Sequence, residues 1–201
     1  MHLHDLAVPA TSAARSAFEL AETFHSPALL HHCVRSYVWA AALAAQEGTE
    51  YDAELLYVAA LLHDIGLTSP FEHPSTSFEE VGGQVAYVFA SGASWPVRRR
   101  ERVAEVVARH MGWAGDPADD REARLLRRST TIDVTGGGLE LIPGPLRAEV
   151  LARWPRLSFA RGFAAHFQVQ ARRGADLAAG RAVARGALER MAGNPLDVVE
   201  P

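Results

Sequence analysis

Five polar side chains stand where the sequence otherwise predicts apolar helix faces or helix ends: His32, His63, Asp64, His110 and Asp133. A buried imidazole or carboxylate that lacks a partner is costly, so such residues pair with one another or bind a metal ion. Two neutral imidazoles and two carboxylates can surround one divalent cation and leave positions open for water. The residue types therefore indicate metal-activated water as the chemistry of this chain.

Each of these residues also has a structural interpretation. His32 is compatible with a hydrogen-bonded core histidine, and its neighbour His31 fits the helical spacing equally well. The pair His63–Asp64 is compatible with a turn that ends a helix, and Asp133 with a cap at a helix end. His110 at a helix C-terminus complements the helix dipole. Their occurrence together, rather than any one of them, favours the metal site.

Helices must position these side chains, because apolar residues recur at spacings of three and four and no useful alternating strand pattern is found. Ser26-Pro27 and Asp52 have the form of helix starts, and Gly48 and Gly66 of helix stops. The expected fold class is all-α. The predicted helices span 13–24, 28–46, 53–64, 78–91, 97–110, 122–134, 146–154, 159–173 and 175–191.

The length and composition favour one domain. The chain has 201 residues, of which 48% are hydrophobic, and this suffices for one sizeable core. We expect a single helical bundle over residues 1–201. Its core covers about 24–135, and a C-terminal helical extension covers about 145–192.

The charge and residue usage exclude several function classes. The net charge is −4, so no general attraction to nucleic acid is expected. A single cysteine, Cys33, rules out an intramolecular disulfide and suits a reducing cytoplasm, and neither a signal peptide nor a membrane span is expected. All twenty basic residues are arginine, which removes Schiff-base and P-loop lysine chemistry. The expected partner is a small-molecule substrate, and a homo-oligomer is left open.

The ordered set "HHCVR", "LHDIG" and a late aspartate resembles the HD-domain superfamily of metal-dependent phosphohydrolases. In that pattern the first histidine precedes an arginine by three positions, which His32 and Arg35 satisfy and His31 does not. The resemblance implies a bundle of about five core helices. It implies His32, His63, Asp64 and Asp133 as ligands of one divalent ion. We expect Zn²⁺, with Fe²⁺, Mn²⁺ and Ni²⁺ as alternatives.

Within that superfamily, "HDIGLT", "SFEEVGG" and "WPRLSFARGF" look most similar to the cyanamide hydratase branch. Phe78 stands where dinuclear members have a histidine, which implies one metal ion rather than two. Leu67 stands where the 5′-deoxynucleotidase-like members have a catalytic glutamate. The resemblance implies a lyase that adds water to a nitrile-like carbon and turns cyanamide into urea. Asp64 and His110 are the predicted catalytic residues, with His110 as a proton donor or as a group that orients the substrate.

Two other functions compete with the hydratase. A metal-dependent phosphohydrolase of nucleotides is the first, and a non-catalytic module with a structural metal is the second. The arginine run Arg98-Arg99-Arg100-Arg102 would favour the first if it lined the metal cleft, although a solvated helix face is the simpler interpretation. The aromatic residues that can wall a small pocket are Tyr57, Phe71, Phe78, Trp95 and Trp113, each of which also fits the core.

Overall fold

The computed structural model describes residues 1–112 and 120–197, and these residues form helices and loops without a strand. The all-α prediction is confirmed. Short 3₁₀ turns lie at Leu3–Asp5, Ile65–Leu67, Leu139–Leu141 and Pro195–Asp197. The α-helices are α1 (Ser12–Phe24), α2 (Pro27–Glu47), α3 (Ala53–Leu62), α4 (Phe78–Gly92), α5 (Val97–Arg109), α6 (Arg121–Thr135), α7 (Gly144–Arg153), α8 (Phe159–Arg173), α9 (Ala178–Ala184) and α10 (Ala187–Ala192).

Side-chain caps fix the starts of the helices that carry the predicted site. The hydroxyl of Ser26 accepts a hydrogen bond from the Leu29 amide at the start of α2, where Pro27 occupies the first helical position. The carboxylate of Asp52 caps α3 in the same way. Each cap satisfies an amide that the first helical turn leaves without a partner. The starts predicted from the sequence are therefore confirmed to within a residue.

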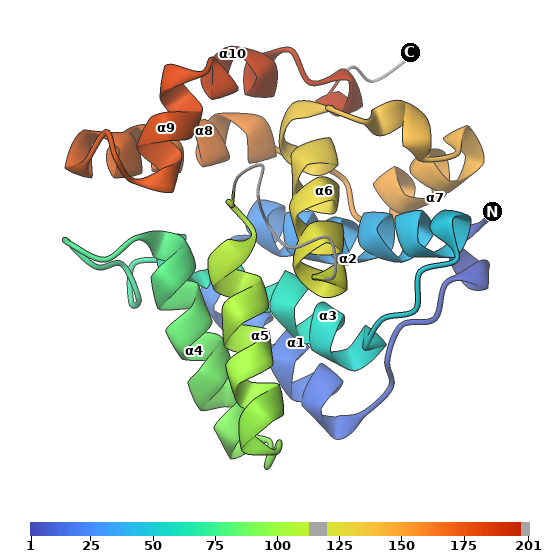
Figure 1. Cartoon of the computed structure of the whole chain (residues 1–201). Coiled ribbons are helices and arrows are strands. Elements are labelled where there is room, and N and C mark those ends of the chain that lie inside the picture. Colours follow the sequence, from blue (N-terminus) through green and yellow to red (C-terminus); the bar gives the residue numbers. More distant parts are fainter. Residues whose placement is uncertain (113–119, 198–201) are drawn as a thin grey trace.

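The long helix α2 runs through the middle of the molecule and organises the larger hydrophobic cluster. Its residues from 32 to 44 are all buried, as expected for a helix covered on every side. It packs against α3 and α6, while α4 and α5 form an antiparallel pair beside α3 (Figure 1). Helices α1 to α7 all contribute buried residues to this cluster.

A second hydrophobic cluster joins the C-terminal helices to the bundle. Helices α8, α9 and α10 lie together as a layer at one end of the molecule (Figure 1). Phe159, Phe163 and Phe167 of α8 pack in this cluster with Leu29 of α2 and Phe78 of α4. The seam between the two clusters is where α2 presents His32, so the predicted site lies between the bundle and the C-terminal layer.

The prediction of one helix over 175–191 is wrong. The chain forms α9 and α10 instead, with Gly186 between them at a φ of 77°, a left-handed conformation that favours glycine. Gly180 in α9 lies so close to the carbonyl of Gly174 that a β-carbon would collide with that oxygen. Gly186 therefore ends the helix that the sequence predicts, and Gly180 lets α9 fold back closely onto the end of α8.

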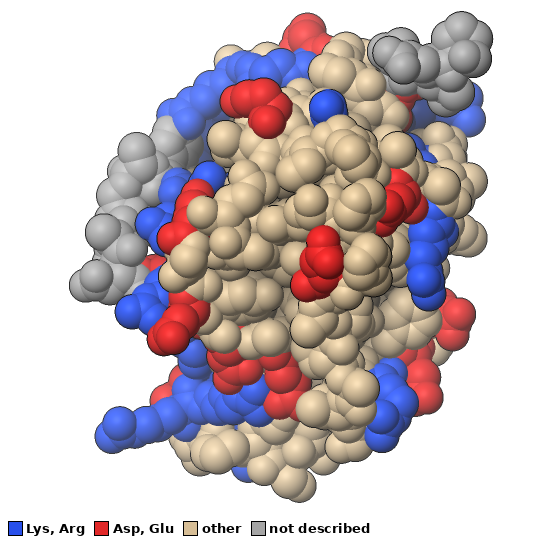
Figure 2. All heavy atoms as spheres, turned by 90° about the vertical axis from the view of Figure 1, so that its right-hand side faces the viewer, with Lys and Arg blue, Asp and Glu red and all other residues tan. Residues whose placement is uncertain are grey.

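The surface carries charges of both signs. On the face shown in Figure 2, acidic and basic side chains are interspersed around the edge and the middle is largely uncharged. None of the described helices combines the length and apolarity needed to cross a bilayer. Opposite charges also pair at the surface of the molecule. One example is Arg128 and Glu47, where Nη1 and Oε1 lie 2.5 Å apart.

Candidate metal centre

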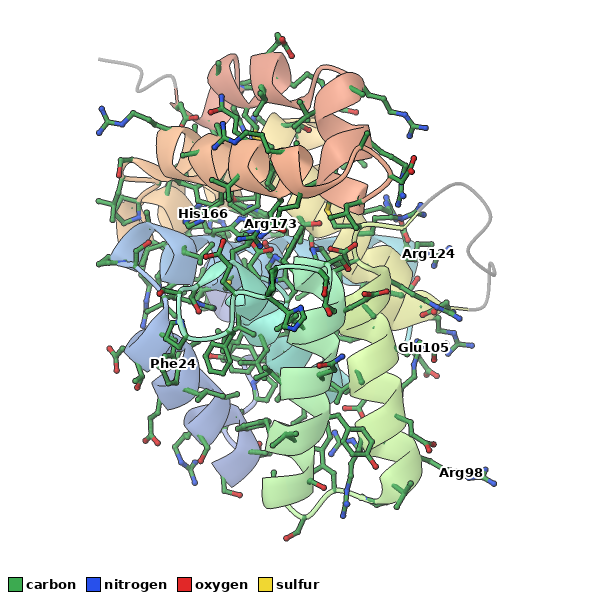
Figure 3. The ribbon with its side chains drawn as sticks, turned by 90° about the vertical axis from the view of Figure 1, so that its left-hand side faces the viewer. Phe24, Arg98, Glu105, Arg124, His166 and Arg173 are labelled. Carbon is green, nitrogen blue, oxygen red and sulfur yellow. The ribbon has the colours of Figure 1, made fainter. Side chains whose placement is uncertain are left out.

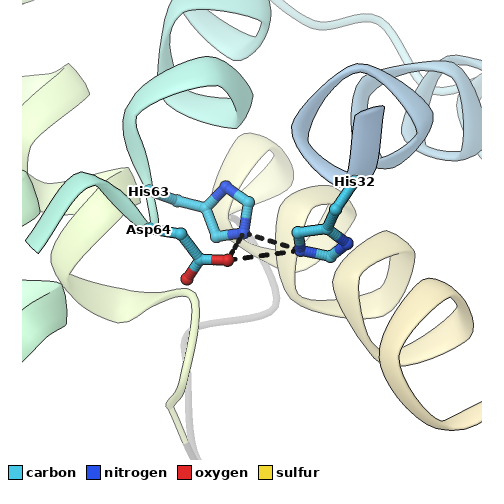
Figure 4. A group of neighbouring side chains, drawn as sticks. All are labelled: His32, His63 and Asp64. Carbon is cyan, nitrogen blue, oxygen red and sulfur yellow. Dashed lines mark hydrogen bonds and ion pairs between the residues drawn. The ribbon is translucent and has the colours of Figure 1, made fainter. Parts of the chain in front are cut away.

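Three predicted ligands converge at one buried point. Nε2 of His32 lies 3.2 Å from Nε2 of His63 and 3.3 Å from Oδ2 of Asp64. The same carboxylate oxygen lies 3.1 Å from Nε2 of His63 (Figure 4). None of the three residues is more than 1% exposed. Among the described residues, this is the only group of three or more histidine, cysteine or acidic side chains close enough to share a cation.

The end of α3 brings two consecutive residues to the same point. The last helical residue is Leu62, and His63 still has helical backbone angles. The backbone then leaves the helix at Asp64, whose φ is −104° and ψ 7°. Within a helix, two consecutive side chains point about 100° apart. The change in backbone angles at Asp64 lets the side chains of His63 and Asp64 converge instead. The turn packs tightly on α4, because a β-carbon at Gly66 would overlap the carbonyl of Phe78.

Hydrogen bonds on the far side of each ring assign the histidine tautomers. Nδ1 of His63 lies 2.8 Å from the carbonyl of Ala60, which can only accept, so this nitrogen carries the proton. Nδ1 of His32 lies 2.7 Å from the carboxylate of Asp133 and donates in the same manner. In neutral rings, both Nε2 atoms therefore direct lone pairs toward Asp64. Three electron-pair donors then meet without a hydrogen between them, which is a suitable environment for a divalent cation.

The charge balance of Asp64 supports this conclusion. Both of its oxygens are buried and neither forms a hydrogen bond of acceptable geometry, although the two Nε2 atoms are near. Burial opposes its charge, but the imidazoles of His63 and His32 hold the pKa of the Asp64 carboxyl well below its usual range. Burial likewise opposes charge on His63, and Asp64 raises the pKa of that ring well above its ordinary value. Either a proton or a metal cation must lie between these groups, so the residues present fit a divalent ion.

His110 contributes a third buried imidazole beside His32, His63 and Asp64. It follows α5, and its Nδ1 lies 2.7 Å from the carbonyl of Val107. Its Nε2 lies 3.8 Å from Oδ1 of Asp64, the oxygen that points away from the other two histidines. Burial and the nearby His63 lower the pKa of His110 to about 3. The ring is therefore neutral, with a proton on Nδ1 and a lone pair on Nε2. Nε2 must accept a proton before it can donate one.

Asp133 lies on the opposite side of the His32 ring from the three converging atoms. Its carboxylate accepts two hydrogen bonds of 2.8 Å from Arg35 and one of 3.0 Å from Trp39, in addition to the bond from His32 Nδ1. Burial opposes its charge, but Arg35 and His32 keep the pKa of Asp133 well below its usual range. In this arrangement Asp133 orients His32 through Nδ1. Its role as a direct ligand stays a prediction.

Residues outside the predicted set complete the surroundings of Asp133. Arg156 donates to the carbonyl of Asp133 at 2.7 Å, and Asn194 donates to the same carbonyl at 2.9 Å. Arg156 is held in turn by two hydrogen bonds to Asp197. Helical spacing could have singled out Trp39, which follows His32 by seven positions on the same face of α2. The segment "WPRLSFARGF" contains Arg156, but neither it nor any local pattern around Asn194 indicates a contact with Asp133, because both residues reach Asp133 only through the tertiary fold.

His31 does not contribute to the centre. Its ring is half-buried, and its Nδ1 lies 2.8 Å from the carbonyl of Pro155. The ring of His32 instead stacks on Phe159 of α8, with 4.4 Å between the ring centroids. The choice of His32 over His31 therefore agrees with the geometry of α2.

A cavity of about 460 Å³ extends from the centre toward the C-terminal layer. Its inner end is formed by His32, His63, Asp64 and His110. The aromatic residues among its described lining are Phe163 and Phe167 of α8. Tyr57, Phe71, Phe78 and Trp95, which the sequence offers as walls, are not among those lining residues; Trp113 lies outside the described residues.

The arginine run at the start of α5 lies away from the cavity. Arg98 projects outward from the molecule at the far end of α5 (Figure 3). Nη2 of Arg99 lies 2.8 Å from Oδ1 of Asp52, and Nη2 of Arg102 lies 2.5 Å from Oδ1 of Asp120. Arg100 hydrogen-bonds the carbonyl of Trp95. None of the four is among the described residues that line the cavity, so the geometry favours a charged helix face.

Comparison with known proteins agrees with this centre. The HD domain family matches residues 29–134, which is more than half of the chain and includes every predicted ligand. The chain therefore belongs to the HD domain family.

Two relatives indicate the branch. Cyanamide hydratase DDI2 and cyanamide hydratase DDI3 of Saccharomyces cerevisiae are each 28% identical to this chain over 162 residues. The aligned region covers 78% of this chain and 71% of each relative. The chain is thus an HD-domain metalloenzyme of the cyanamide hydratase-like type.

Proposed function

We propose that this chain catalyses the addition of water to the carbon of a small nitrile, with cyanamide as substrate and urea as product. The observation that carries the proposal is the meeting of two Nε2 lone pairs and an Asp64 oxygen that has no hydrogen-bond donor. The names of the two yeast relatives support the substrate. We propose His32, His63 and Asp64 as the ligands of the ion, which we propose to be Zn²⁺. Asp133, the fourth residue predicted as a ligand, accepts the hydrogen bond from Nδ1 of His32 and orients that ring.

The chain's own residues can carry the protons of this reaction. A divalent ion, when bound, lowers the pKa of a coordinated water and polarises the nitrile. As the carbon–oxygen bond forms and one π bond of the nitrile breaks, the water must lose a proton and the nitrogen must gain one. Nε2 of His110 lies 3.8 Å from Oδ1 of Asp64, so these two groups can relay the first proton from the water to the nitrile nitrogen. The second hydrogen of the water moves from oxygen to nitrogen when the resulting isourea tautomerises to urea. Asp133 holds His32 in the required tautomer throughout.

A product assay tests the proposal directly. Protein reconstituted with Zn²⁺, Fe²⁺, Mn²⁺ or Ni²⁺ is incubated with cyanamide, and urea is measured through urease and ammonia, with a control lacking urease. We expect urea only in the metal-loaded samples, and chelation should remove the activity. Failure of every metal form to produce urea would refute the cyanamide assignment.

A phosphohydrolase is the second candidate, and one observation favours it. Arg127, Arg128 and Arg190 are among the residues that line the cavity, and arginine binds phosphate well. Against it, Leu67 is a buried aliphatic residue that cannot serve as the acid of the nucleotidase-like mechanism. Release of phosphate from a panel of nucleoside monophosphates, without urea from cyanamide, would decide for the phosphohydrolase.

A further inference from the structure

The cavity beside the centre is much larger than cyanamide. Its volume is about 460 Å³, within the roughly 300–1,000 Å³ that is usual for sites of drug-sized ligands. Cyanamide has three heavy atoms and fills the space of about two or three water molecules, each with roughly 30 Å³ of liquid volume. Bound alone, it would leave most of the cavity to water.

The part of the cavity wall that α8, α9 and α10 contribute is mostly apolar, so water next to it is unfavourable. Phe163 and Phe167 of α8 lie one turn apart with their rings tilted toward each other and the centroids 4.7 Å apart, and Phe163 also contacts the ring of His32. Ala182, Ala187 and Met191 of α9 and α10 line the same space. An apolar ligand that displaces water from such a surface gains free energy in proportion to the area covered.

The hydroxyl groups in the lining do not call for a polar ligand. Thr130 and Thr131 of α6 both line the cavity. Each hydroxyl donates to the carbonyl of Arg127 within its own helix, at 3.0 Å and 2.8 Å. The hydrogen-bonding needs of these two hydroxyls are therefore met without a substrate.

Two of the arginines in the lining are engaged as well, since Arg128 pairs with Glu47 and Arg190 donates to the carbonyl of Arg185. The buried titratable groups of the cavity lie at its inner end, where the three histidines and Asp64 meet.

We propose that the substrates this site prefers are nitriles with an apolar body, about the size of an aromatic ring, that occupies the cavity along Phe163 and Phe167. The nitrile group lies at the inner end and the body extends toward α9 and α10. This inference rests on the proposed hydration chemistry and narrows its substrate class. The product is the corresponding amide, because one water adds across the carbon–nitrogen triple bond and both of its hydrogens end on nitrogen.

The first experiment compares two nitriles on the metal-loaded full-length chain. Phenylacetonitrile carries the apolar body and cyanamide lacks it, and the amide and urea products are quantified by liquid chromatography with mass detection. We expect kcat/KM for phenylacetonitrile to exceed that for cyanamide by about ten-fold or more, as hydrophobic pockets typically discriminate. Binding of phenylacetamide to the same protein, measured by titration calorimetry, gives a readout that does not depend on turnover.

A matched pair of variants locates the body in the cavity. Ala182 lines the cavity, whereas Ala184, two positions later in α9, is exposed and is not among the lining residues. Ala182→Phe should lower kcat/KM for phenylacetonitrile about ten-fold more than for cyanamide, because the new ring takes the space of the substrate body. Ala184→Phe should change neither value, and circular dichroism confirms that both variants fold.

The outcomes separate the two proposals. Hydration of cyanamide without hydration of phenylacetonitrile would overturn the substrate class and leave the proposed function standing. Equal effects of Ala182→Phe on both nitriles, or no binding of phenylacetamide, would also overturn it. Hydration of phenylacetonitrile with the expected loss in Ala182→Phe supports it even if cyanamide is a poor substrate. Failure to hydrate either nitrile would refute the proposed function and this inference together.

Discussion

Two buried carboxylates flank the ring of His32, and the fold treats them in opposite ways. Asp133 accepts hydrogen bonds from His32, Arg35, Trp39 and Arg156, and four of these donor–acceptor distances are 3.0 Å or shorter. Asp64 is equally buried, yet no donor satisfies either of its oxygens.

The difference separates a structural charge from a functional one. A buried charge persists when the fold compensates it, as Arg35 does for Asp133. Asp64 has no such donor, so its charge is balanced only by a proton on the neighbouring imidazoles or by a bound cation. We infer from this contrast that a metal ion and a substrate would bind on the open side of His32, and that Asp133 on the other side holds the ring in place.

The largest effect is expected from Asp64→Asn. The amide keeps the volume of the carboxylate but removes the charge that faces the two imidazoles, so metal affinity should fall by more than about 100-fold and turnover should be abolished. Because an amide N–H can donate to an Nε2 lone pair, the metal-free variant should be as stable as the wild type or more stable. Elemental analysis and chemical denaturation measure the two quantities.

The control for this variant is Asp176→Asn, which changes an exposed aspartate before α9. It should bind the metal at full stoichiometry and retain activity. Stoichiometric metal in Asp64→Asn, or a large loss of its stability without metal, would contradict the contrast between the two carboxylates.

The next effect is expected from Asp133→Asn, and it should have the opposite character. Removing this charge leaves Arg35 buried without its partner, so the free energy of unfolding should fall by about 3–5 kcal/mol even in metal-free protein. Metal affinity should fall as well, because His32 loses its orienting acceptor, and further still if Asp133 is itself a ligand. Denaturant unfolding with and without metal separates the two contributions.

The exposed residue Glu140 provides the reference, since Glu140→Gln should leave stability within about 0.5 kcal/mol of the wild type. An Asp133→Asn protein that loses metal while keeping its apo stability would show that the carboxylate is mainly a ligand. That result would contradict the inference that only Asp64, and not Asp133, binds the metal ion.

Sequence patterns predicted the open side of the site better than the closed side. His63 and Asp64 are adjacent in the chain, and the stop at Gly66 indicates that they end a helix, so local rules suffice to place them. The helical register leaves both His31 and His32 open, and the choice of His32 comes from the family resemblance, in which an arginine stands three positions later. What local rules do not predict is that Asp133 faces Nδ1 rather than the converging atoms, because that depends on the packing of α2 against α6.

The C-terminal region was predicted less well for the same reason. Arg156 and Asn194 meet at the carbonyl of Asp133 from positions 38 residues apart in the chain, which no spacing rule anticipates. The break between α9 and α10 depends on the left-handed conformation of Gly186, and the tight turn from α8 into α9 depends on the close approach of Gly180 to Gly174. A glycine inside a helical pattern signals a weak point, but only the fold decides whether the helix breaks there.

A third carboxylate, Asp120, extends the comparison to an ion pair whose basic partner, Arg102, is 28% exposed, and it should give the smallest effect. It caps α6 through the Ala123 amide and pairs with Arg102, and its side chain is 5% exposed. Burial alone would raise the pKa of Asp120, but the hydrogen bonds from Arg102 and Ala123 lower it below its ordinary value of 3.8. Its folded pKa is thus below its unfolded pKa, so its stabilisation is present above pH 4 and is lost as the pH falls through the folded value.

Asp120→Asn should therefore reduce the free energy of unfolding by only about 1 kcal/mol at pH 7, since asparagine still caps a helix and the pair is partly solvated. The deficit should shrink as the pH falls below the unfolded pKa of the aspartate, because the wild-type side chain then loses its charge advantage. Urea unfolding of both proteins between pH 3 and pH 7 measures this. If Asp120→Asn lost as much free energy of unfolding as Asp133→Asn, the number of hydrogen-bond partners would set the cost of removing a paired carboxylate in this fold. The burial of the arginine partner would then not set that cost.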